Sequence, residues 1–196
     1  MLKQYLKKIL KVARQGDARE ETYYSTLETL ITEFAKSKNK KDVYVTAQPK
    51  KTDAGNPDFR VWSGKQKIVG YMEAKTPDKN LDEIEKTEQV ERYKTTFPNF
   101  VLTNFLEFRF YRDGSLVDKV RIADPMVIYS LRGTPSVENE DGFENLLKKF
   151  LSFSFPSITS AQPLAVELAK RTRFLRDEVI AEELREEWSR KDTWVL

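Results

Sequence analysis

The sequence predicts a mixed α/β domain followed by a helical C-terminal tail. Between about residues 17 and 135, short runs rich in β-branched and aromatic residues alternate with segments of helical apolar spacing. Two pairs of these runs are separated by short turns, and one turn contains Asp113-Gly114, a strong hairpin signal. From Asp141 onward the apolar spacing is helical only. We therefore expect a mixed-sheet core with N-terminal helices over 1–135 and a helical extension over 136–196.

The composition restricts the chemistry that this chain can perform. It has 196 residues, of which 39% are hydrophobic and 33% charged, but no cysteine and no histidine. These absences exclude disulfides, thiolate metal sites, Ser-His-Asp triads and histidine-based nucleases. Any catalysis must use Asp, Glu, Lys, Tyr, Ser or Thr, and any bound metal should be a hard cation held by oxygen.

Charge and hydropathy indicate where such a protein works. The net charge is +3, with 34 basic and 31 acidic residues. This mild excess is compatible with DNA binding but does not by itself predict it. No apolar run approaches the length of a membrane span, and the basic start lacks the apolar segment of a signal peptide. We expect a cytoplasmic protein that does not bind membranes.

Two helices are expected at the N-terminus. Residues 2–14 place apolar side chains on one stripe and lysines elsewhere, which indicates a surface helix packed on the domain; the alternative is an arm that contacts phosphates. A second apolar stripe covers 18–35, and Glu20 and Glu21 lie in its first turn, where negative charge suits the helix dipole. Capping explains both acids, and the chemical alternative is that one of them reaches a metal ion.

Asp58 and Glu73 fall on two short strands joined by a turn. Side chains alternate faces along a strand, so Glu73 and Lys75 point the same way. If the turn is centred on residues 65–66, antiparallel pairing places Asp58 opposite Glu73. A shift of one residue would place Asp58 opposite Tyr71, still within reach of Glu73.

The segments after this hairpin predict a crossover, a second hairpin and two more helices. Residues 81–96 have helical spacing, with Gln89 and Tyr93 four apart on one face. The strand–helix–strand order around them is long enough for a parallel crossover. The remaining elements are expected at 100–104 (strand), 106–112 and 116–122 (hairpin strands), 143–150 (helix) and about 160–188 (last helix).

The end of the first hairpin suits a magnesium site for phosphodiester chemistry. Asp58 and Glu73 offer carboxylate oxygens, and the main-chain carbonyl of Ala74 could complete the shell while positions remain for water and a phosphate oxygen. Lys75 would hold or help deprotonate the water and offset developing negative charge. For this motif taken alone, the alternative is a set of exposed ion pairs on a hairpin.

Several motifs together resemble a known nuclease superfamily. Pro57-Asp58 with Glu73-Ala74-Lys75 resembles the PD-(D/E)XK signature, and Gln89-Val90-Glu91-Arg92-Tyr93 matches the Gln-x-x-x-Tyr motif of its RecB-like branch. Glu20-Glu21-Thr22-Tyr23 is similar to the Glu-x-x-Tyr helix that opens the nuclease region of Type IIG and Type ISP restriction-modification enzymes. Residues 164–170 and 175–177 resemble the helix that closes that region, so the resemblance covers about 18–185.

The resemblance implies a restriction-endonuclease-like fold and a Mg²⁺-dependent endonuclease that cuts double-stranded DNA, with Mn²⁺ as an alternative ion. By it, Asp58 and Glu73 would be metal ligands together with the Ala74 carbonyl. Lys75 would be the water-positioning base. Gln89 would orient the site or contact DNA, and Tyr93 would support it.

The opening helix would add an acid to this set. We prefer Glu20, which stands three residues before Tyr23 as the pattern requires. Glu21 stands three before Tyr24, so the choice stays open at this point.

The same enzymes continue into a methyltransferase, with a helicase between in the ISP type, whereas this sequence ends at Leu196. We expect either a fragment that joins such domains in a larger polypeptide or a stand-alone relative, with a transient dimer as a route to double-strand cleavage. Two other classes remain as alternatives. One is a catalytically silent, nuclease-like DNA-binding domain, and the other is an assembly domain in which the last helix is the working part.

Overall fold

The computed structural model describes residues 1–52, 54–65, 67–129 and 136–154, and beyond these only Ala165, Leu168, Ala169, Thr172 and Trp188. The chain divides into two compact units, Met1–Ser154 and Phe155–Leu196. The expected division was at residue 135, and the first unit extends further because the helix that follows packs on the sheet. Most of the expected last helix, including residues 175–177, lies outside the described residues.

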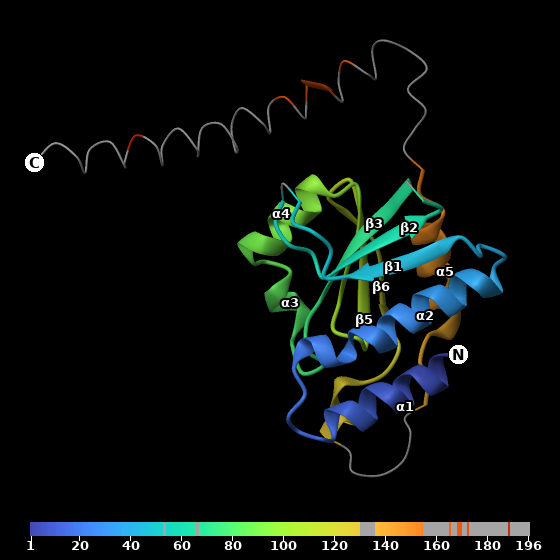
Figure 1. The fold of residues 1–196 in the computed structure, drawn as a ribbon. Coiled ribbons are helices and arrows are strands. Elements are labelled where there is room, and N and C mark those ends of the chain that lie inside the picture. Colours follow the sequence, from blue (N-terminus) through green and yellow to red (C-terminus); the bar gives the residue numbers. More distant parts are fainter. Residues whose placement is uncertain are drawn as a thin grey trace, which may run out of the picture. The chain divides into compact units, whose positions relative to one another are not determined.

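A six-stranded open sheet forms the centre of the first unit (Figure 1). Its spatial order follows the chain, and every neighbouring pair is antiparallel except β3 and β4, which are parallel. This arrangement confirms the predicted crossover. The strands are β1 (Val43–Ala47), β2 (Phe59–Ser63), β3 (Lys67–Ala74), β4 (Asn99–Thr103), β5 (Glu107–Arg112) and β6 (Ser115–Arg121).

Helices cover the two faces of the sheet unequally. One face packs against α1, α2 and α5 in the larger apolar core. The other packs against α3 and α4 in a smaller core that lies over β3, β4 and β5. The helical elements are α1 (Leu2–Ala13), η1 (Glu20–Tyr23), α2 (Tyr24–Ser37), α3 (Leu81–Ile84), α4 (Glu88–Thr96), η2 (Pro125–Tyr129) and α5 (Glu140–Leu151).

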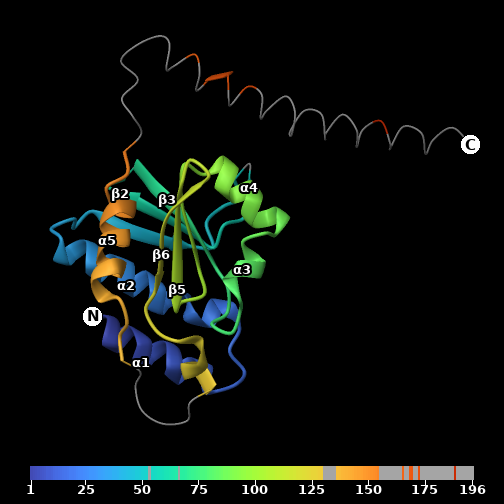
Figure 2. The ribbon, with the colours of Figure 1, turned by 180° about the vertical axis from the view of Figure 1, so that it is seen from behind.

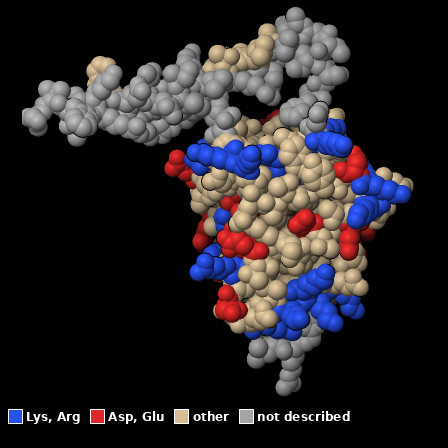
Figure 3. All heavy atoms as spheres, viewed as in Figure 1, with Lys and Arg blue, Asp and Glu red and all other residues tan. Residues whose placement is uncertain are grey.

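Helix α1 is the packed surface helix that its spacing predicts. Its apolar stripe is buried, and basic side chains occupy the exposed side over α1 (Figure 3). The second helix differs at its start, because residues 20–23 form a 3-10 turn before α2 begins at Tyr24. Tyr23 therefore turns into the core, where its ring lies 5.1 Å from that of Phe105.

The pairing of β2 with β3 confirms the expected register at the end that carries Asp58 and Glu73. Phe59 pairs with Met72, which places the preceding residue, Asp58, opposite Glu73. The register shifts by one residue beyond Val61, at an irregularity toward the turn. Because the shift lies on the turn side, it leaves the Asp58 end of the ladder unchanged.

The single helix expected over 81–96 is wrong, since two short helices occupy this segment. Asn80 accepts a hydrogen bond from the backbone of Asp82 and caps α3, and Thr87 caps α4 by accepting from Val90. A side-chain cap at Thr87 competes with helix continuation, so the chain turns there and starts again. The turn at Asp113-Gly114, in contrast, is as predicted, with φ of 48° and 82°.

Helix α5 runs alongside the sheet and contacts β3, β5 and β6 (Figure 2). Asn99 ties it to the strands by donating to the carbonyls of Val69 (2.8 Å) and Phe150 (3.0 Å). Gly70 permits this approach, because a Cβ there would lie 2.5 Å from the carbonyl oxygen of Asn99. No helix in the described part of the chain is long and apolar enough to cross a membrane.

Candidate active site

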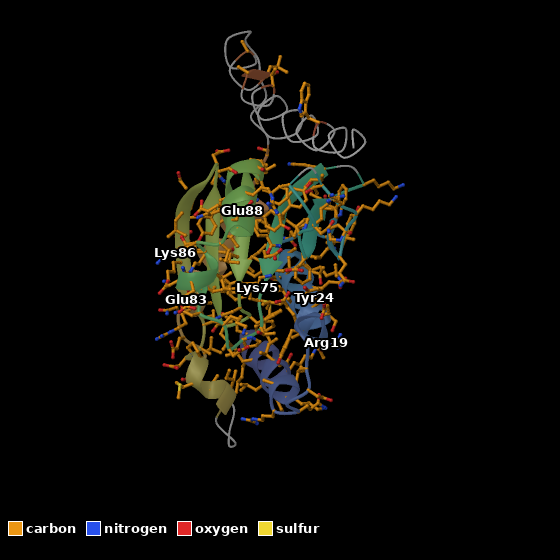
Figure 4. The ribbon with its side chains drawn as sticks, turned by 90° about the vertical axis from the view of Figure 1, so that its left-hand side faces the viewer. Arg19, Tyr24, Lys75, Glu83, Lys86 and Glu88 are labelled. Carbon is orange, nitrogen blue, oxygen red and sulfur yellow. The ribbon has the colours of Figure 1, made fainter. Side chains whose placement is uncertain are left out.

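The predicted acidic residues meet where β2 begins and β3 ends. Asp58 immediately precedes β2, Glu73 is the penultimate residue of β3, and Lys75 follows that strand. In Figure 4, Lys75 lies between Tyr24 on one side and the α3–α4 segment on the other. The site is therefore bounded by η1 and α2 on one flank and by α4 on the opposite flank.

Asp58 is held by two hydrogen bonds. Its Oδ2 accepts from the backbone N–H of Ala74 at 2.8 Å, and its Oδ1 accepts from the hydroxyl of Tyr24 at 2.6 Å. The N–H and C=O of one strand residue point to the same side of the strand. The Ala74 carbonyl thus faces the same side as Asp58, as a shared ligand set requires.

Glu73 is the most buried charged group of the site, with 1% of the residue exposed. Its Oε1 accepts from Lys75 Nζ at 2.6 Å and from Gln89 Nε2 at 3.0 Å. Its Oε2 is buried and has no hydrogen-bond partner in the described part of the chain. Burial, followed by the nearby negative charge of Asp58, raises the pKa of Glu73 well above its ordinary range.

Lys75 is surrounded by acids. Burial disfavours its charge, but Glu73, Glu20 and Asp58 outweigh that effect and raise the pKa of Lys75. Its ammonium is 2.6 Å from Glu73 and 3.9 Å from Glu20. In the metal-free protein Lys75 is therefore a cation that can position water or a phosphate oxygen by donation.

Glu20, not Glu21, reaches this cluster. Glu20 Oε1 is 3.1 Å from the Tyr24 hydroxyl, whereas Glu21 is exposed. Burial is the largest cause that raises the pKa of Glu20, and the charge of Asp58 adds to it. The tyrosine that faces the site is Tyr24 rather than Tyr23, which the motif had paired with Glu20, because the 3-10 turn sends Tyr23 into the core.

Tyr24 is a site residue that the sequence did not reveal. Its hydroxyl has one proton, and the shorter contact, to Asp58, is the one that receives it. Burial and the bond to Asp58 raise the pKa of Tyr24, so it stays a donor at all working pH values. Spacing alone did not distinguish it from Tyr23, since both follow an acid by three residues.

For the Mg²⁺-dependent DNA cleavage that the sequence predicts, replacing Tyr24 by phenylalanine should lower the rate by about 10- to 100-fold and weaken Mg²⁺ binding, because Asp58 loses the donor that orients it. The ring packs 4.6 Å from Phe59, and phenylalanine keeps that contact, so the fold should be retained. Cleavage rates measured across a Mg²⁺ titration give both effects. Tyr23→Phe, one residue earlier, is the matched control and should leave the titration unchanged. Equal effects of the two substitutions would contradict a positioning role for Tyr24.

Gln89 and Tyr93 lie together against Glu73, as their shared helix face predicts. Gln89 Nε2 donates to Glu73 and lies 3.2 Å from the Tyr93 hydroxyl. Tyr93 is 1% exposed and packs under the loop that precedes Asp58, where Arg92 donates to the Ala54 carbonyl at 2.8 Å. Gln89 can thus orient the carboxylate directly, whereas Tyr93 supports Gln89 and the loop.

The oxygen atoms of this site fit a hard divalent cation. Asp58, Glu73 and the Ala74 carbonyl are the type of ligand that Mg²⁺ prefers. The buried Oε2 of Glu73 has no partner among the described residues, which is costly unless a cation or water satisfies it. No group of three or more acidic side chains in the described part lies close enough to hold a metal by itself. A bound ion would therefore need the backbone carbonyl, water or substrate oxygens in addition to the two carboxylates.

Comparison with known proteins supports the fold. No family model matches this sequence, and no curated protein matches it. A chain in the cryo-EM structure of a DrdV–DNA complex is similar, with a TM-score of 0.55 and 20% sequence identity. The match covers 80% of this chain and 14% of that chain. Together with the open mixed sheet, this likeness confirms the expected restriction-endonuclease-like α/β fold.

Proposed function

We propose that this chain is a Mg²⁺-dependent endonuclease domain of the PD-(D/E)XK type that hydrolyses phosphodiester bonds in double-stranded DNA. The convergence of Asp58, Glu73 and Lys75 at the ends of two paired strands carries this proposal, because phosphodiester hydrolysis needs charge neutralisation and a positioned water at one place. The similar chain was solved in a complex with DNA, which supports DNA as the substrate.

Each side chain of the site has a separate role in the proposed hydrolysis. Asp58 and Glu73, with the Ala74 carbonyl, would hold Mg²⁺, which when bound polarises the phosphate and lowers the pKa of water. Lys75 donates to the attacking water or to a phosphate oxygen, and its positive charge offsets the charge that develops on the phosphate. Gln89 keeps Glu73 in place.

The chain spans only 14% of the similar DNA-complex chain. We propose that it serves as the cleavage module of a restriction-modification enzyme, with methyltransferase or helicase domains as partners in a larger polypeptide. Sequence choice would then lie in those partners, and a transient dimer would supply the second cut.

Nicking of supercoiled plasmid tests the activity and the site together. The wild-type chain should nick with Mg²⁺ and not with EDTA, and Asp58→Ala and Lys75→Ala should each reduce the rate by about 100- to 10,000-fold. Asp42→Asn is the control, because this exposed carboxylate bonds Ser63 at the opposite end of β2. Nicking that survives in both site variants would overturn the assignment. If no variant nicks, calorimetric Mg²⁺ binding that depends on Asp58 would indicate a silenced nuclease, and its absence would favour a DNA-binding domain without metal chemistry.

A further inference from the structure

The sheet face that carries Glu73 also carries stacked aromatic rings over β1 and β2. Tyr44 and Trp62 are paired directly across these strands, with ring planes 10° apart and centroids 6.0 Å apart. The Arg60 guanidinium lies 5.4 Å from the ring centroids of both Trp62 and Tyr71. We call Tyr44, Trp62, Arg60 and Tyr71 the stacked row.

The stacked row leads directly away from the candidate active site. Alternation along β2 puts Asp58, Arg60 and Trp62 on one face, while Phe59 and Val61 are fully buried in the core on the other. The four residue-to-residue steps from Asp58 to Trp62 span about 13 Å of strand, close to the rise of about four stacked nucleotides. A DNA strand in the site would therefore pass along the row.

The row is partly exposed, because Tyr44 is exposed and Arg60, Trp62 and Tyr71 are half-buried. Helices α3 and α4 pack over β3, β4 and β5, with Tyr71 partly buried at the margin of their core. Tyr44 on β1 is 42% exposed, so its side chain is open to solvent. An aromatic face is thus available to a ligand beside the buried chemistry of Glu73.

Among the described residues, no acid forms an ion pair with Arg60, so its guanidinium can contact a ligand. Its terminal NH2 group donates to the Lys50 carbonyl at 3.2 Å, and its Nε is buried without a hydrogen-bond partner in the described part of the chain. Among those same residues it forms no ion pair with an acid, in contrast to Arg109, which contacts three carboxylates. The exposed Lys50 and Lys51 of the adjoining loop add further positive charge.

Packing of the sheet edge explains part of this arrangement, since cross-strand aromatic pairs stabilise sheets. It does not explain an arginine that is held between two rings and forms no ion pair with an acid among the described residues. Cations interleaved with exposed rings are the usual features of surfaces that bind single-stranded nucleic acid, where bases stack on rings and phosphates meet the charges. Bases within a duplex already stack on each other and cannot use such rings.

We propose that the stacked row binds unpaired nucleobases of the DNA strand that enters the active site. This inference rests on the proposed function and narrows its substrate class to DNA with a locally unpaired strand beside the cut. Tyr44 and Trp62 stack on the bases, and Arg60 contacts the backbone phosphate between them and Asp58.

Binding of a fluorescent oligothymidylate of about twenty nucleotides, followed by anisotropy in EDTA, tests the proposal. Tyr44→Ala and Trp62→Leu should each weaken binding by about 10-fold, and Trp62→Phe, which keeps a ring, by less than about 3-fold. In the same variants, the affinity for a fully paired duplex should fall by less than about 2-fold. Leu116→Ala, on the opposite edge strand β6 and 49% exposed, is the control and should change neither affinity.

Unchanged oligothymidylate affinity in both aromatic variants, or equal losses for duplex and single strand, would overturn the proposal. Melting curves of each variant identify any loss of binding that comes from unfolding. In that case the affinity of Trp62→Phe, which keeps a ring, decides whether the ring is needed. The proposed nuclease is judged separately. Ring-dependent binding by a chain that neither nicks plasmid nor binds Mg²⁺ through Asp58 would support the stacked row and contradict the proposed nuclease. Nicking without ring-dependent binding would support the nuclease and contradict the stacked row.

Discussion

Glu73→Gln is expected to abolish metal-dependent cleavage and at the same time to stabilise the metal-free protein. The substitution removes one of the two carboxylates proposed to hold Mg²⁺, so nicking should fall by about 1,000-fold or more. It also removes a carboxyl that the fold keeps out of water, and glutamine has nearly the same shape. In EDTA at pH 8, the free energy of unfolding should rise by about 1 to 2 kcal/mol.

The direction of the stability change follows from the pKa of Glu73. Burial, with the charge of Asp58, raises it to about 8, whereas an unfolded glutamate has a pKa near 4.5. The unfolded chain therefore releases this proton first, and the stability of the wild type should fall as pH rises from about 4.5 to about 8. Below that window the advantage of Glu73→Gln should disappear.

Urea unfolding of both proteins at pH 5 and pH 8, in EDTA and in Mg²⁺, provides the measurement. Mg²⁺ should stabilise the wild type more than the variant, because only the wild type keeps both carboxylates proposed to bind the ion. Glu33→Gln, at an exposed position of α2, should change stability by less than about 0.5 kcal/mol. A variant less stable than the wild type at pH 8 without metal would show that burial of Glu73 is not costly.

Arg109→Met is expected to destabilise the fold by about 3 to 5 kcal/mol, because it leaves Glu85 without a cation and leaves Asp82 and Glu107 with Lys119 alone. Only 3% of the Arg109 side chain is exposed, and its guanidinium contacts Asp82, Glu85 and Glu107. The first two belong to α3 and the turn that follows it, and Glu107 begins β5. Gln89 lies in the segment that begins with α3. The guanidinium thus holds the start of that segment against the sheet.

Urea unfolding compares this variant with Arg121→Met as a control. The Arg121 side chain is 49% exposed, and its ion pair with Glu138 spans 3.4 Å, so its loss should cost less than about 1 kcal/mol. Adding Glu85→Gln to Arg109→Met should restore part of the lost stability, since it removes the uncompensated charge. Similar losses for the two arginine variants would show that the buried cluster contributes no more than a surface pair.

The local elements of this fold were predictable because their signals lie within a few residues of each other. The Asp113-Gly114 turn required positive φ at both positions and adopts it. The spacing of Asp58 and Glu73 about their turn allowed two registers, and the pairing of Phe59 with Met72 selects the one that places the two acids opposite each other. The break at Thr87 escaped prediction, because the apolar spacing continued through a residue whose side chain caps a new helix.

The residue types of the site could be predicted, but only some of the contacts between them could. Strand alternation and the nuclease motifs pointed to Asp58, Glu73, Lys75, Gln89 and Tyr93, which the structure brings together. The choices between Glu20 and Glu21, and between Tyr23 and Tyr24, depended on a 3-10 turn that rotates the chain before α2. The residue spacing of a regular α-helix does not predict that rotation.

The sequence by itself predicted the strands and their turns and left two registers, with Asp58 opposite Glu73 or opposite Tyr71, since backbone alternation and turn length act over short distances. Only the tertiary structure decided that Tyr24 holds Asp58 and that Arg60 lies between two rings. It also decided that, among the described residues, one buried oxygen of Glu73 has no hydrogen-bond partner and Arg60 has no ion pair with an acid. The physical reason is that desolvation and side-chain partners depend on segments far apart in the chain. The packing of α2, β2, β3 and α4 against one another supplies those contacts.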